Sequence, residues 1–165
     1  MTAEKYRLRT LARLAILAMI LVLAPMTAIG SVHRSKGQTI YLSVVPQVQG
    51  GSKLNTAYLR FWILVRNTDL NHAVTVQSIT YYNAGGQMAK KILETPLKLD
   101  PLASHGIRFE EEALAIPQGM SSCMLVQWDA SEKVSPVLVE GVVIGSGTGW
   151  TAGLVFKGVV IEEKE

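Results

Sequence analysis

The sequence has few of the residues that form disulfides or commonly act in catalysis: it contains one cysteine, Cys123, and three histidines in 165 residues. A lone cysteine excludes an intramolecular disulfide, and Cys123 lies too far along the chain to be the lipid-bearing cysteine of a lipoprotein. We interpret it as a small buried side chain. The GxSxG, HExxH and paired Cys/His spacings are all missing. We therefore expect a protein that carries no cofactor and is not an enzyme.

An excess of positive charge is missing from most of the chain. The formal net charge is +3, but four of the cations precede residue 14. From Ser31 onward the chain has twelve Lys and Arg and twelve Asp and Glu, so this part has no net charge. Phosphate backbones are bound by clustered Lys and Arg. The stretch Gly145–Gly149 (GSGTG) resembles a phosphate loop, but an expected strand follows it in place of the helix whose N-terminus would bind the phosphate. We predict that neither nucleic acid nor nucleotide is bound.

The first thirty residues are built like an export signal. A basic start is followed by an apolar run, Leu14–Ala24, and by a short stretch of small and polar residues that begins at Pro25 and ends at Gly30. We predict cleavage after Gly30, and retention as a membrane anchor is the alternative. The domain is then periplasmic or secreted, or it is held at the inner membrane outside the cytoplasm, because the basic start stays in the cytoplasm. We divide the chain into an export segment (1–30), a linker (31–37) and one domain (38–165).

Long helical patterns are also lacking, and strand patterns take their place. In Tyr58–Arg66 every second residue is apolar, as in a strand with one face in a core. In Ala73–Asn83 the alternation slips between Val76 and Ile79, which predicts a β-bulge. The other expected strands are Gln38–Val45, Gln87–Glu94, Leu97–Leu102, Gly106–Phe109, Met124–Trp128, Val137–Ile144 and Leu154–Ile161. Short strands separated by turns predict an all-β fold, an antiparallel β-sandwich of Greek-key, immunoglobulin-like type. The one candidate for a short helix is Glu110–Ala115.

Five short stretches together resemble a known family. They are Arg66–Asp69 (RNTD), Ile79–Asn83 (ITYYN), Leu99–Ala103 (LDPLA), Val126–Trp128 (VQW) and Val139–Gly145 (VEGVVIG). In this order and spacing they resemble a bacterial family known as domain of unknown function three-one-two-four, from about Ile40 to Ile161. The resemblance implies an exported bacterial protein of β-rich fold. It implies no activity and supplies no functional residues.

Two groups of polar residues deserve a chemical interpretation. Asn67, Asp69 and Asn71 alternate like the opening of a calcium loop, but the sixth position is His72 in place of Gly. We interpret this cluster as a turn in which Asx side chains bond their own backbone. The histidines at 33, 72 and 105 are expected in loops. A metal-dependent enzyme assembled from Asp69, His72 and His105 is the alternative that the sequence leaves open.

The candidate binding residues are Arg60, Trp62 and Arg66, which share one face of the strand Tyr58–Arg66. A Trp flanked by two Arg is a frequent composition of protein interfaces. The competing interpretation is that Trp62 covers the edge of the core with the Arg stems packed over it. We expect a non-enzymatic binding module of the cell envelope, acting on an unidentified envelope protein or component. A purely structural envelope domain is a further alternative.

Overall fold

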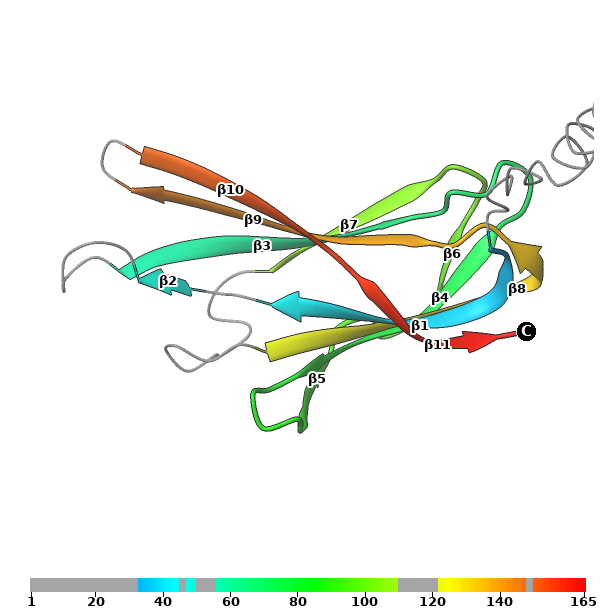
Figure 1. Cartoon of the computed structure of the whole chain (residues 1–165), viewed down its shortest axis with the longest axis horizontal. Coiled ribbons are helices and arrows are strands. Elements are labelled where there is room, and N and C mark those ends of the chain that lie inside the picture. Colours follow the sequence, from blue (N-terminus) through cyan, green and yellow to red (C-terminus); the bar gives the residue numbers. More distant parts are fainter. Residues whose placement is uncertain (1–32, 45–46, 50–55, 110–121, 148–149) are drawn as a thin grey trace, which may run out of the picture. The chain divides into compact units, whose positions relative to one another are not determined.

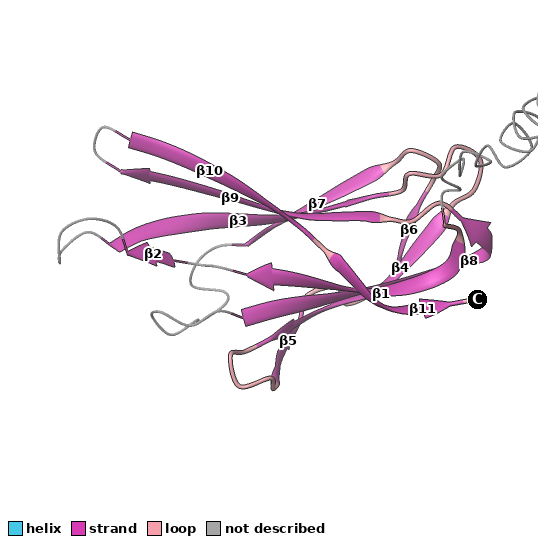
Figure 2. Ribbon diagram, in the orientation of Figure 1, coloured by secondary structure: helices cyan, strands magenta, loops and turns pink. Residues whose placement is uncertain are grey.

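The strand patterns of the sequence become two antiparallel sheets in a computed structural model of the chain (Figures 1 and 2). The structure describes residues 33–44, 47–49, 56–109, 122–147 and 150–165. Throughout these ranges the regular secondary structure is β-strand (Figure 2). The export segment and the helix expected at Glu110–Ala115 lie outside the described residues. Among the residues described, no helix is long and apolar enough to span a membrane.

The first sheet has the order β11-β1-β8-β4-β5, and β6 also pairs with β4. Its strands are β1 (Ser35–Val44), β4 (Val74–Tyr82), β5 (Met88–Lys91), β6 (Leu97–Leu99), β8 (Ser122–Val134) and β11 (Val159–Lys164). β1 begins three residues before the domain boundary expected at Gln38. The register of β4 against β8 shifts between Val76 and Ser78, which confirms the bulge predicted from the broken alternation.

The second sheet has the order β10-β9-β3-β2, and β7 also pairs with β3. Its strands are β2 (Gln47–Gln49), β3 (Thr56–Arg66), β7 (Ser104–Phe109), β9 (Leu138–Gly147) and β10 (Trp150–Lys157). β10 pairs antiparallel with β9, so a strand follows the glycine-rich stretch as expected. Residues 145–147 of that stretch belong to β9 itself, and residues 148 and 149 lie outside the described part of the chain.

The inward faces of the two sheets supply the core. In β3 the buried residues Phe61, Ile63 and Val65 alternate with residues that face outward. Tryptophan at 128, on β8, is the largest fully buried side chain and is 1% exposed. The rings of Phe61 and Phe109 pack at 6.0 Å between centroids. Large apolar side chains buried in this way provide most of the driving force for folding.

The single strand expected over Leu154–Ile161 is two strands in different sheets. β10 ends at Lys157 in the second sheet, and β11 starts at Val159 in the first (Figure 1, orange to red). Between them Gly158 donates its N–H to the carbonyl of Val139 at 2.8 Å. A Cβ at this glycine would overlap the side chain of Ile40, so only glycine allows the chain to pass this closely between the sheets.

Candidate functional site

The outward face of β3 carries the predicted candidate residues. Arg60 and Arg66 are exposed, and Trp62 and Leu64 on the same face are half-buried, while Phe61, Ile63 and Val65 point into the core. Trp62 does not belong to the buried apolar cluster. The side chain therefore lies on the solvent side of the second sheet and is not part of the sandwich interior.

Strand register decides the neighbours of Trp62. It lies opposite Val142 of β9 on one side and opposite Arg108 of β7 on the other. Val142 in turn lies opposite Val155 of β10. Residues directly opposite in antiparallel strands project from the same face of the sheet, so Val155, Val142, Trp62 and Arg108 form one row across four strands.

Arg108 stands over the indole of Trp62, with its guanidinium carbon 5.9 Å from the ring centroid. A cation in this position is attracted by the negative face of the ring, which favours the indole orientation that presents this face to Arg108. Arg108 belongs to the site but was missed in the sequence, because the expected strand Gly106–Phe109 has no pattern that reveals its pairing with β3.

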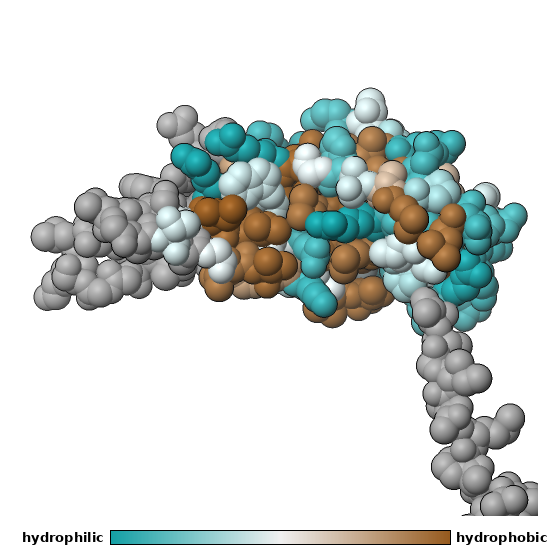
Figure 3. All heavy atoms as spheres, turned by 90° about the horizontal axis from the view of Figure 1, so that it is seen from above, coloured by the Kyte–Doolittle hydropathy of each residue, from teal (hydrophilic) through white to brown (hydrophobic). Residues whose placement is uncertain are grey.

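Other cations surround the row on the same face. Arg66 lies 3.6 Å from the carboxylate of Glu140, measured from Nε to Oε2. Arg60 lies opposite Ile144, and Lys157 lies opposite Glu140. We call this surface the Trp62 face, and it comprises Arg60, Trp62, Arg66, Arg108, Glu140, Val142, Ile144, Val155 and Lys157. It combines apolar side chains with four cations and one carboxylate. Figure 3 shows the domain from above, where apolar patches (brown) are interspersed with hydrophilic residues (teal).

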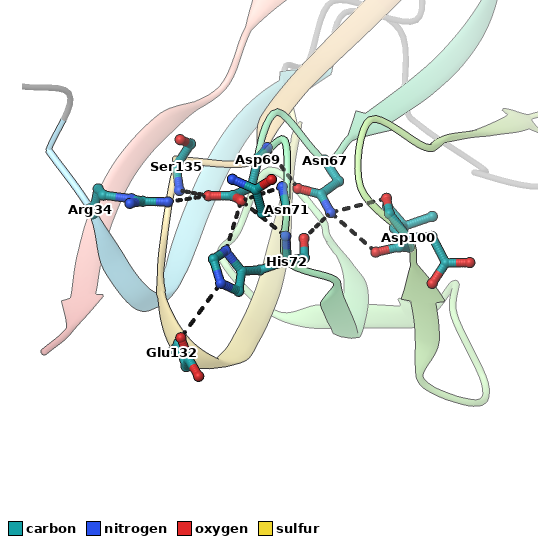
Figure 4. A network of polar contacts seen from close by, with 9 residues as sticks. Arg34, Asn67, Asp69, Asn71, His72, Asp100, Glu132 and Ser135 are labelled. Carbon is teal, nitrogen blue, oxygen red and sulfur yellow. Dashed lines mark hydrogen bonds and ion pairs between the residues drawn. The ribbon is translucent and has the colours of Figure 1, made fainter.

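A second polar centre lies in the turn after β3 (Figure 4). The Asp69 side chain is 1% exposed, and its oxygens accept five hydrogen bonds. Oδ1 accepts from the backbone N–H of Asn71 and of His72 and from Nδ1 of His72, at 2.9 to 3.0 Å. Oδ2 accepts from the Arg34 guanidinium at 2.6 Å and from the Ser135 N–H at 2.9 Å.

These contacts hold Asp69 in its charged form. Hydrogen bonds from the Ser135 and Asn71 amides, with further help from Arg34 and His72, keep the pKa of Asp69 far below its usual range, although burial acts in the opposite direction. A buried carboxylate is tolerated only where its charge is paired and its lone pairs are used. Asp69 meets both conditions.

Asn67 organises the same turn from the other side. Its amide donates to the carbonyls of His72, Leu99 and Asp100 at 2.8 to 3.2 Å, and its Oδ1 accepts from the Asp69 N–H at 3.0 Å. The side chain thus joins the turn after β3 to the turn after β6, where Leu102 has a φ of 61°. The cluster of Asn67, Asp69 and Asn71 is thus a turn in which Asx side chains bond their own backbone, as the sequence predicted. That it also joins other loops is shown only by the structure.

The residues of the metal-enzyme alternative are not assembled. Asp69 and His72 are in contact, but the Asp69 oxygens are occupied by the five donors described above. His105 is exposed within β7, and not in a loop as expected, and it makes no hydrogen bond or ion pair with Asp69 or His72. Within the described residues, no group of three or more His, Cys, Asp or Glu is placed to hold a metal ion.

Cys123 is half-buried on β8, so it is less enclosed than the sequence suggested. Burial raises the pKa of its thiol, while a hydrogen bond with Tyr41 acts in the opposite direction. A raised pKa keeps the sulfur as a thiol, which is the less reactive form.

Comparison with known proteins gives a family and a distant structural likeness. No curated protein matches the chain. The crystal structure of Thermotoga maritima 1070 is similar with 15% sequence identity and a TM-score of 0.42, covering 78% of this chain and 97% of that one. The family model described as "Protein of unknown function (DUF3124)" matches residues 37–161, the range over which the five sequence stretches indicated it. The chain therefore belongs to this family of unknown function.

Proposed function

We propose that the chain is an exported, non-enzymatic binding protein of the bacterial cell envelope and that the Trp62 face is its binding surface. The observation that carries this proposal is the placement of Arg108 over the Trp62 ring within an apolar row. Trp and Arg contribute more binding energy at protein interfaces than other residue types. A tryptophan already oriented by a cation loses little conformational freedom when a partner binds.

Export is supported by the order of the first thirty residues, in which a basic start precedes Leu14–Ala24 and a small-residue stretch ends at Gly30. After cleavage the protein is periplasmic or secreted, and with the segment retained it is tethered to the inner membrane with the domain outside. Greek-key, immunoglobulin-like connectivity is part of the proposal. It is supported by the way successive strands alternate between the sheets, with β7 and β9 in the second sheet and β8 between them in the first.

The charge of the surface suggests the chemistry of the partner. Among the described residues of the Trp62 face, the cations Arg60, Arg66 and Lys157 outnumber the one carboxylate, Glu140, which lies 3.6 Å from Arg66. A partner with an acidic rim around an apolar centre complements this arrangement, and such charge complementarity speeds association and selects partners.

The test is affinity capture from the native envelope with the wild type and two variants. Trp62→Ala removes the centre of the face, and Tyr82→Ala is the control because Tyr82 is a half-buried aromatic residue at the end of β4 in the other sheet. We expect the same partner with the wild type and with Tyr82→Ala, and its loss with Trp62→Ala. If the wild type and both variants captured the same partner equally well, the Trp62 face would be rejected as the binding surface.

A further inference from the structure

Four buried polar side-chain atoms have no hydrogen-bond partner among the described residues. They are Oγ of Ser35, Oε1 of Gln38, Oγ of Ser122 and Nε1 of Trp128, and none of these residues is more than 5% exposed. Nearly all buried polar groups in native proteins bind another protein group or an ordered water molecule. Two of the four atoms, on Gln38 and Trp128, belong to one place in the fold.

Gln38 of β1 and Trp128 of β8 lie directly opposite each other in antiparallel strands. Residues opposite each other in this way project from the same face of the sheet, with Cβ atoms about 4.5–5.5 Å apart. Both side chains belong to the inward face, where Gln38 is 4% and Trp128 is 1% exposed. A buried amide oxygen and a buried indole N–H therefore enter the same part of the interior.

The orientation of the Gln38 amide is set by Glu163 of β11. Nε2 of Gln38 donates to Oε1 of Glu163 at 2.8 Å, and an ionised carboxylate can accept from the amide nitrogen but cannot donate to the amide oxygen. Oε2 of the same carboxylate contacts Nε2 of His33 at 2.7 Å. The nitrogen of the amide is thus turned toward β11, and its oxygen is the atom left without a partner.

The chemistry of the two atoms restricts what can bind them. Nε1 of Trp128 can only donate a hydrogen bond, and Oε1 of Gln38 can only accept one. The indole N–H repels a metal cation, and the amide oxygen repels an anion. The ligand must therefore accept from Trp128 and donate to Gln38, and it must be small because both residues are almost fully enclosed. Water meets these conditions.

We propose that one buried water molecule bridges Nε1 of Trp128 and Oε1 of Gln38. The hydrogen bonds then run in one direction, from the indole to the water, from the water to Gln38, and from Gln38 to the carboxylate of Glu163. Hydrogen bonds in such a chain polarise and strengthen one another. Two polar partners are enough to hold a buried water in place.

This site connects the core to the C-terminal strand. β11 is exposed at all six of its positions, and through Gln38 and the water it is joined to Trp128, the largest fully buried side chain. The site lies in the first sheet and shares no residue with the Trp62 face of the second sheet. It is therefore independent of the proposed binding function.

The test is nuclear magnetic resonance of the chain as isolated, in detergent if the export segment is retained. The indole N–H proton of Trp128 should show a nuclear Overhauser effect to a long-lived water. Gln38→Met removes both amide atoms at similar length and should abolish this signal. Ser122→Ala is the matched control, because it removes another buried hydroxyl without a partner at the start of β8, and the signal should persist. Melting temperatures check that each variant is folded.

Ser35→Ala should also keep the signal, and its loss would assign the signal to an exchanging hydroxyl proton and reject the water. A crystal structure of the wild type should show a water at about 2.7–3.2 Å from both atoms. Absence of the signal in the wild type, or electron density for a protein group between the two atoms, would overturn the inference. A signal that persists in Gln38→Met would reject the bridge. If that variant does not fold, the two distances in the wild-type crystal decide.

Discussion

The Arg34 guanidinium donates to the carboxylate of Asp69 at 2.6 Å, across 35 positions of the sequence. Arg34 directly precedes β1, and Asp69 lies in the turn after β3. The contact therefore ties the start of the domain to a buried turn, which in turn binds the backbone of Ser135. Several elements of the fold thus depend on one side chain.

Replacement of Asp69 by Ala should destabilise the domain more than replacement of Arg34 by Ala. Asp69→Ala leaves the N–H groups of Ser135, Asn71 and His72 without an acceptor, and breaking a buried ion pair from one side costs about 3–5 kcal/mol. Arg34 is 46% exposed, so its removal should cost only about 1 kcal/mol. Urea unfolding of both variants measures the difference, and equal losses would contradict it.

The same carboxylate predicts an acid-sensitive stability. Because hydrogen bonds from the Ser135 and Asn71 amides lower the pKa of Asp69 in the folded state, its stabilising contribution is fully present above the unfolded pKa of about 4. It should be lost progressively as the pH falls from there toward the folded pKa. Unfolding midpoints measured from pH 7 to pH 2 should show this loss in the wild type and a smaller one in Asp69→Asn.

The two tryptophans at 62 and 128 should respond differently to truncation. Trp128→Ala empties a site in the core, which typically costs about 3–5 kcal/mol. Trp62 is half-buried on the outer face and belongs to no core cluster, so Trp62→Ala should cost about 1 kcal/mol. Melting temperatures of the two variants provide the measurement. A loss at Trp62 as large as that at Trp128 would favour its role in covering the core.

Two strand glycines offer a matched pair. A Cβ at Gly37 would lie 2.6 Å from the carbonyl oxygen of Trp128 and 3.2 Å from the Cα of Asp129, both backbone atoms that cannot turn aside. Gly37→Ala should therefore destabilise the domain by about 1–3 kcal/mol. At Gly153 the nearest atom is 3.7 Å away, so Gly153→Ala should be neutral or stabilise by up to about 1 kcal/mol. Chemical denaturation of both variants tests the contrast.

The export segment should be removed after Gly30. The mature chain would then begin at Ser31 and keep both His33, which contacts Glu163, and Arg34. Mass spectrometry of the protein from the host envelope determines its first residue. A membrane-bound chain that still starts at Met1 or Thr2 would identify an anchor in place of a cleaved signal.

The sequence by itself determined the features that depend on neighbouring residues. The alternation of β3 predicted which of its residues face outward, including Arg60, Trp62 and Arg66. The broken alternation of β4 predicted its bulge, and the cluster of Asn67, Asp69 and Asn71 predicted an Asx turn. Side-chain direction along a strand and bonding within a turn are local properties, so a single stretch of chain contains all the information required.

Only the tertiary structure decided which distant residues meet. Arg108 lies over Trp62 because β7 pairs with β3 in one particular register, and Arg34 reaches Asp69 because β1 starts beside the turn after β3. Similarly, Leu154–Ile161 has the pattern of one strand and becomes two because Gly158 crosses between the sheets. Strand pairing depends on the packing of the whole core, and the same alternating pattern is compatible with many registers and partners.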